Sequence, residues 1–143
     1  MKSIKVSLET ETNRLRGIIS RKELIKNIRL VGNKIFTLEN STCEVLNLLI
    51  CDDDMIMEYN IKYLNHNYET DIITFRYDDK ESDIIISAET VEYNSRRFHT
   101  DFVNELYRVI IHGMLHICGY DDDTPYRRRK IRKLENYYLR FLN

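Results

Sequence analysis

The chain has 143 residues and a formal net charge of −1, from 22 lysine and arginine residues against 23 aspartate and glutamate residues. This length suits a single domain over residues 1–143 with its own hydrophobic core, and the balanced charge leaves any case for nucleic-acid binding to local basic clusters. No apolar run approaches the roughly 18 to 20 residues of a membrane span, and no signal peptide is visible, so we expect a cytoplasmic protein.

The N-terminal part of the chain predicts a strand followed by a helix. Residues 3–8 alternate apolar and polar side chains, as a half-buried strand does. Residues 20–32 have the apolar spacing of a helix. Ser20 and Glu23 form a capping box at its start, and Gly32 is expected to end it as a C′ glycine.

The run CEVLNLLIC, residues 43–51, is short and almost wholly apolar, which favours a buried strand over a helix. Its two cysteines and Cys118 lack C-x-x-C spacing, so we interpret all three as reduced thiols. The aspartates 52–54 end this strand and can cap a helix over residues 55–65. On the inner side of that helix we expect Ile56, Tyr59, Tyr63 and Leu64.

The second half of the chain predicts two more strands and three helices. Strands over residues 71–75 and 83–87 flank a charged turn and precede a helix over residues 88–98. A long helix over residues 100–118, capped by Thr100, comes next, and a last helix lies near the C-terminus. About four strands and five helices indicate an α+β domain with a mixed sheet.

The helix over residues 100–118 is apolar around most of its circumference, so we expect it to be mostly buried. Its polar residues are spaced 4, 3, 4 and 4 along one stripe. A lone histidine on such a stripe is better explained by a solvated face. A pair at i and i+4 points both imidazoles the same way, which suits two ligands of one metal ion. The stripe consists of Asp101, Glu105, Arg108, His112 and His116.

Gly113 follows the first histidine, where a zinc peptidase of the H-E-x-x-H type has its glutamate base. The absence of this glutamate argues against a peptidase. A glycine inside a helix costs about 1 kcal/mol relative to alanine. We therefore expect Gly113 to provide backbone space beside the metal.

A third ligand is expected just beyond the helix. Gly119 can adopt a left-handed conformation that turns the chain back, so one of Asp121, Asp122 and Asp123 can reach the ion. A carboxylate oxygen is a suitable zinc ligand. Three protein ligands leave a position open for water, as in catalytic zinc sites, whereas a structural zinc would need a fourth ligand.

Residues 112–121, HGMLHICGYD, resemble the signature H-G-x-L-H-x-x-G-Y-D of the YbeY-type family of bacterial single-domain metalloproteins. Residues 63–75 and 82–87 resemble two further family segments, so the likeness covers roughly residues 45–140. Most of the family has a histidine as third ligand, at the position of Asp122 here. The resemblance thus favours Asp122, and it implies one divalent metal ion, expected to be zinc. Because an aspartate ligand is negatively charged, it should make water bound to the metal less acidic. An oxygen ligand also makes iron, manganese or nickel more acceptable at the site than an all-histidine set would.

The resemblance also implies an activity. The family is linked to ribosomal RNA maturation, which implies an endoribonuclease that cleaves single-stranded RNA near the 3′ end of small-subunit ribosomal RNA. Ribosomal RNA and components of the small subunit are the implied partners. A family arginine proposed to act in catalysis is absent, because Glu69 stands at its position. His66 lies nearby and is our catalytic candidate, while Asp71 and a hydroxide on the metal are alternative general bases.

A basic cluster, RRRKIRK over residues 127–133, opens the last helix after Thr124 as N-cap and Pro125 at the first helical position. Cations at a helix N-terminus oppose its dipole, so such a cluster makes more sense if phosphates neutralise it. A solvated helix face is the alternative interpretation. Beside a metal site we favour RNA binding, with Arg96, Arg97 and Arg108 as extensions of the patch. The predicted RNA-binding residues are Arg127, Arg128, Arg129 and Lys130.

Two other functions remain open from the sequence. One is a ribosome-assembly or RNA-binding factor whose metal is mainly structural, which the missing arginine makes more attractive. The other is a metallopeptidase or small-molecule hydrolase, against which Gly113 argues.

Overall fold

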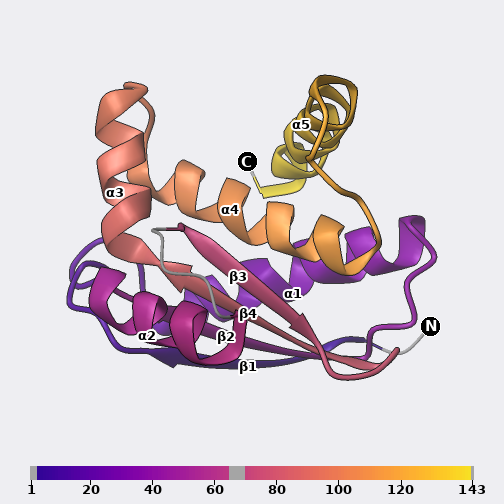
Figure 1. Ribbon diagram of the computed structural model, residues 1–143, viewed down its shortest axis with the longest axis horizontal. Helices are drawn as coiled ribbons and strands as arrows, with labels where there is room; N and C mark the ends of the chain where they lie inside the picture. Colours follow the sequence, from indigo (N-terminus) through magenta and orange to yellow (C-terminus); the bar gives the residue numbers. More distant parts are fainter. Residues whose placement is uncertain (1–2, 65–69, 143) are drawn as a thin grey trace.

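A four-stranded sheet in the order β1-β2-β4-β3 is the centre of the fold (Figure 1). The computed structural model describes residues 3–64 and 70–142. Strands β1, β2 and β4 are mutually parallel, and β3 joins the edge of β4 in antiparallel orientation. The predicted α+β domain with a mixed sheet is therefore confirmed. The strands are β1 (Lys5–Thr10), β2 (Val45–Cys51), β3 (Ile72–Arg76) and β4 (Glu81–Ser87).

Five α-helices surround the sheet within the described residues, as predicted. Figure 1 shows α4 running across the sheet, with α3 at one end of it and α5 beside its other half. None of these helices has the length and apolar character needed to cross a bilayer. The helices are α1 (Arg21–Leu38), α2 (Asp53–Leu64), α3 (Ala88–Arg97), α4 (Phe102–Ile117) and α5 (Pro125–Leu139), followed by the short 3₁₀ helix η1 (Arg140–Leu142).

The two central strands are buried on both faces, which explains why their sequences are continuously apolar. Alternate residues of a strand point to opposite faces of the sheet. One face contributes Leu48 and Ile84 to the main core, together with residues of α1 and α4. The other face places Ile85 in a smaller cluster with Cys51 and with Ile56 of α2. The cysteines are unpaired, and Cys43 and Cys51 are buried.

Helix α1 is longer than predicted. It continues past Gly32 to Leu38, so the expectation that this glycine ends the helix is wrong. Gly32 is instead buried in the helix, and a Cβ there would lie 3.4 Å from Cε of Met114. This glycine therefore lies where α1 passes close to α4. The cap at the other end is confirmed, because the Ser20 side chain accepts a hydrogen bond from the backbone N–H of Glu23.

Two other details of the predicted helices are wrong. The N-cap of α4 is Asp101 rather than Thr100, because the Asp101 carboxylate accepts the backbone N–H of Asn104. A carboxylate at this position also interacts favourably with the helix dipole. In α2, Tyr63 and Leu64 are exposed rather than turned inward.

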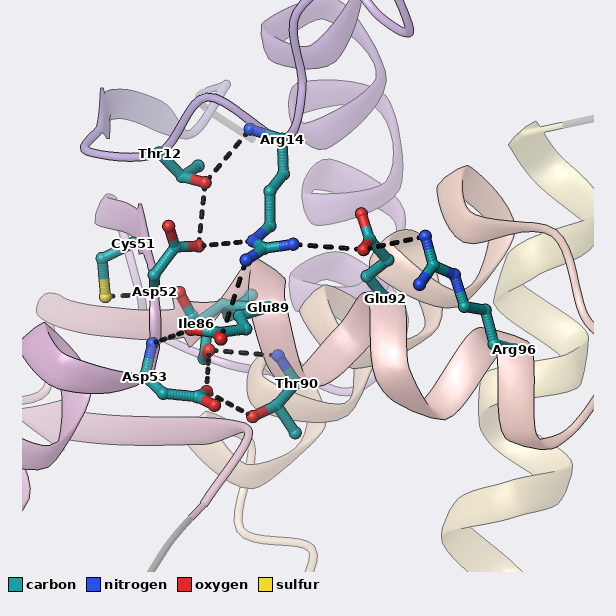
Figure 2. A network of polar contacts seen from close by, with 11 residues as sticks. Thr12, Arg14, Cys51, Asp52, Asp53, Ile86, Glu89, Thr90, Glu92 and Arg96 are labelled. Carbon is teal, nitrogen blue, oxygen red and sulfur yellow. Dashed lines mark hydrogen bonds and ion pairs between the residues drawn. The ribbon is translucent and has the colours of Figure 1, made fainter.

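A polar network ties the segment before α1 to the C-terminal end of β2 and to α3 (Figure 2). Arg14 is its centre. Its guanidinium reaches Asp52 at 3.2 Å, Glu92 at 3.1 Å and Glu89 at 3.6 Å. Arg96 approaches Glu92 at 3.2 Å from the other side. The network fixes the start of α3, and α3 leads directly into α4.

Candidate metal centre

His112 and His116 lie one turn apart near the C-terminal end of α4. Their rings meet edge to face with centroids 4.5 Å apart, and the two Nε2 atoms are separated by 2.9 Å. Both side chains are about one-fifth exposed, at 21% and 23%. The two imidazoles thus share one small region at the surface of a largely buried helix, as the spacing predicts.

The chain turns back just after α4 and brings Asp122 to the histidines. Gly119 has a φ of 102°, and the turn is closed by a backbone hydrogen bond from Tyr120 N to Leu115 O at 3.0 Å. Oδ2 of Asp122 lies 3.3 Å from Nε2 of His112 and 3.9 Å from Nε2 of His116. The predicted use of Gly119 is confirmed.

The two neighbouring aspartates face a different partner. Asp123 and Asp121 pair with Arg127 at 2.9 Å and 3.8 Å. Of the three aspartates, only Asp122 belongs to the group with His112 and His116, whose ligand atoms all lie within 4.8 Å of one another.

These three residues fit a divalent metal ion. Two atoms that each lie about 2.0–2.2 Å from a tetrahedral ion are about 3.3–3.6 Å apart. The observed separations of 2.9, 3.3 and 3.9 Å bracket that range. Two imidazole nitrogens and one carboxylate oxygen are also a donor set that zinc and its neighbouring transition metals accept.

Glu135 of α5 is a member of this site that was not predicted. It is 4% exposed, and its Oε2 accepts a hydrogen bond of 2.6 Å from Nδ1 of His112. One sequence signal was present, because Glu135 shares an otherwise apolar face of its helix with Ile131 and Tyr138, at i, i+4 and i+7. An acid on such a face needs a buried partner.

The site contains three groups with shifted pKa values. For His112, burial opposes the charged form, but the hydrogen bond and charge of Glu135 outweigh it, so the pKa is raised. For His116, burial and the nearby charge of His112 lower the pKa. For Asp71, burial raises the pKa, although the charge of His112 opposes the change. Shifted pKa values gathered in one group of side chains are typical of functional sites.

A cavity of about 660 Å³ opens beside the histidines. Asp71, just before β3, lies on its wall together with His112, Asp122 and Glu135. The basic side chains of α5 supply much of the rest. The basic residues that line the cavity are Arg108, Arg128, Arg129, Arg132 and Lys133.

The structure distributes the predicted RNA-binding residues unevenly. Arg128 and Arg129 line the cavity. Arg127 is engaged with the two aspartates described above, and Lys130 lies over the ring of Tyr120 at 5.7 Å. Arg132 and Lys133 belong to the predicted basic cluster, although not to the four residues chosen from it, and they also line the cavity. His66 and Glu69 lie outside the described residues.

Gly113 provides backbone space, as predicted, but the space is taken by the sheet rather than by the metal site. A Cβ at this position would lie 2.7 Å from Cδ1 of Ile72 and 3.0 Å from Cδ1 of Ile84. The glycine therefore lets α4 approach the sheet on the face of the helix that packs against Ile72 and Ile84. It positions the histidines by holding the helix against β3 and β4.

Comparisons with known proteins show the family of this chain and agree with its fold. A protein-family model described as Endoribonuclease YbeY matches residues 8–143. A protein of that name from Parabacteroides distasonis is 44% identical over 100 residues, which cover 68% of this chain and 70% of the relative. Another of that name, from Chlorobium phaeobacteroides, is 37% identical over 130 residues, covering 89% and 91%. The solution structure of a Thermotoga maritima protein superposes on this chain with a TM-score of 0.64 and 24% identity. The superposition covers 95% of this chain and 87% of the Thermotoga maritima chain, so the two are similar in fold.

Proposed function

This chain belongs to the endoribonuclease YbeY family, and from that premise we propose that it cleaves single-stranded RNA at a metal centre formed by His112, His116 and Asp122. The observation that carries the proposal is the convergence of three ligand atoms within 4.8 Å of one another, beside a cavity with basic walls. The residues are arranged for a phosphate-bearing substrate next to a metal ion.

The three ligands would hold one divalent ion, for which we propose zinc on the strength of the two imidazole donors. When bound, such an ion supplies Lewis-acid chemistry for the hydrolysis of a phosphodiester. A peptidase mechanism is not supported, because Gly113 stands where the glutamate base would be and is enclosed by isoleucines.

The protein itself would bind and orient the RNA backbone. Arg128, Arg129, Arg132 and Lys133 lie along one wall of the cavity, where their charges can pair with successive phosphates. Arg129 and Lys133 are one helical turn apart and exposed. We propose that Arg129 and Lys133, rather than Arg127 and Lys130, contact the phosphates.

A general base is needed to accept a proton from the attacking nucleophile. Among the described residues, Asp71 is the candidate best supported, since it lines the same cavity as His112 and Asp122. Burial raises its pKa, which makes the carboxylate a stronger base. His66 stays a proposal that rests on the sequence.

The natural substrate and setting are proposed from the family resemblance. We propose that the chain acts on ribosomal RNA, near the 3′ end of the small-subunit RNA, in association with components of that subunit in the cytoplasm. The alternative, an assembly factor whose metal is mainly structural, predicts metal-dependent stability without RNA cleavage.

The test is cleavage of a single-stranded RNA oligonucleotide by protein loaded with one equivalent of zinc. We expect His116→Ala to abolish cleavage and metal retention. Intact RNA with fully metal-loaded parent protein would overturn the enzyme proposal and favour the assembly factor.

RNA binding is tested separately by titrations at several salt concentrations. Arg129→Ala combined with Lys133→Ala is expected to weaken binding and to reduce the salt slope by about 1.4, because each phosphate contact contributes about 0.7 for single strands. Lys22→Ala combined with Lys26→Ala is the matched control, with the same charge and spacing on α1. Equal effects of the two pairs would contradict the proposed binding wall.

A further inference from the structure

Glu135 is a buried carboxylate that the chemistry proposed above does not use. Its side chain is 5% exposed, and both of its oxygens are engaged. Oε1 pairs with Arg108 at 3.2 Å and with Arg132 at 3.6 Å, and Oε2 lies 2.6 Å from Nδ1 of His112. A carboxylate removed from water in this way is stable only with such partners.

The contact with His112 selects one form of the imidazole. A carboxylate accepts hydrogen bonds, so Nδ1 of His112 must carry a hydrogen and donate it to the bond with Glu135. In the neutral ring, Nε2 is then left with a free lone pair. Nε2 is the atom that faces Asp122 at 3.3 Å and His116 at 2.9 Å. Glu135 thus directs the lone pair of His112 toward the other two ligand atoms.

Glu135 comes from a different helix than the histidines, so it also fixes the position of α5 relative to α4. Arg108 lies one turn before His112 on α4 and pairs with Oε1 of Glu135, while its other terminal nitrogen donates to Asn136 at 2.8 Å. Arg108 thus holds Oε1 of Glu135, and Oε2 of the same carboxylate holds the imidazole ring of His112.

We propose that Glu135 is a positioning residue that fixes the tautomer and ring orientation of His112 for metal binding, a proposal that rests on the metal centre described above. Carboxylates that accept a hydrogen bond from a metal-bound histidine commonly affect metal affinity by about 10- to 100-fold. We infer an effect of that size here.

The test uses the full chain and compares Glu135→Gln, Glu135→Asp and Glu92→Gln. The control Glu92→Gln also removes a carboxylate held between two arginines, but in the network around Arg14 (Figure 2). Zinc affinity is measured by competition with a chelator. We expect a loss of 10- to 100-fold for Glu135→Gln, a smaller loss for Glu135→Asp, and less than about 3-fold for the control.

A second readout needs no metal. Nitrogen-15 spectra of the histidine rings report which nitrogen carries the proton in the metal-free protein. At a pH above the raised pKa of His112, where the ring is neutral, we expect the Nδ1-protonated form in the parent protein and a mixture of tautomers in Glu135→Gln. If Glu135→Gln does not fold, Glu135→Asp carries both measurements.

The outcomes separate the two proposals. A parent protein that binds no zinc, yet shows the tautomer change, would overturn the metal centre while leaving the action of Glu135 on His112 intact. Unchanged tautomer and unchanged zinc affinity in Glu135→Gln would show that Glu135 only joins the two helices, and the inference would be wrong.

Discussion

Gly113→Ala is expected to destabilise the protein, although alanine is the better helix former. The exchange should gain about 1 kcal/mol in helix propensity. The new methyl group would lie 2.7 Å from Ile72 and 3.0 Å from Ile84, and forcing a methyl group into a filled core costs about 1–3 kcal/mol. We expect a net loss of about 1 kcal/mol in the free energy of unfolding, with α4 pushed away from the sheet.

Gly32→Ala is the matched control, since both glycines are buried in helix interiors. Its nearest neighbour, Cε of Met114, lies 3.4 Å from the added Cβ, and Cγ2 of Ile4 lies at 3.6 Å. These are ordinary contact distances, so the gain of about 1 kcal/mol in propensity should be largely retained. Urea unfolding of the two variants should therefore differ by about 2 kcal/mol. Equal stabilities would refute the reasoning.

Ile72→Val provides a further check, because it removes the Cδ1 atom that a methyl group at position 113 would meet first. In the parent protein this exchange should cost about 0.5–1.5 kcal/mol. Combined with Gly113→Ala it should cost less, and the difference measures the coupling between the two positions. Additive effects would mean that Ile72 does not limit the approach of α4.

Three more predictions concern other groups. Burial raises the pKa of Asp71, so the folded state favours the protonated carboxyl. The contribution of this group to stability is therefore fully present at pH values below the ordinary pKa of an aspartate, and it is lost as the pH rises through the raised pKa. In metal-free protein, Asp71→Asn should therefore increase the free energy of unfolding at pH 7, and urea unfolding at pH 3 should show no gain. Arg14→Ala should cost about 1 kcal/mol at low salt and less in 1 M NaCl, whereas Arg96→Ala, with a side chain 79% exposed, should stay within about 0.5 kcal/mol. Thermal unfolding should show a loss of about 1–2 kcal/mol for Tyr138→Phe, whose hydroxyl donates to a carboxylate at the end of α1, and none for the exposed Tyr126→Phe.

Much of the candidate site is local, and this part could be predicted from the sequence. His112 and His116 share a face because a helix brings residues four apart together. Gly119 turns the chain because it tolerates a positive φ, and Asp122 lies only a few residues beyond it. The apolar runs in β2 and β4 likewise predict strands that are buried on both faces.

The remaining features depend on segments that are distant in the sequence. Glu135 lies 23 residues from His112, and only the docking of α5 on α4 brings its carboxylate to the imidazole. The sequence around Gly113 shows that a buried helix contains a glycine. It does not show which neighbouring element packs closely against that glycine. Ile72 and Ile84 come from two strands of the sheet, and their contact with α4 is set by tertiary packing. Local spacing thus brings His112 and His116 together, and the family resemblance selects Asp122 among the three aspartates. The tertiary structure decided what holds these candidate ligands in place.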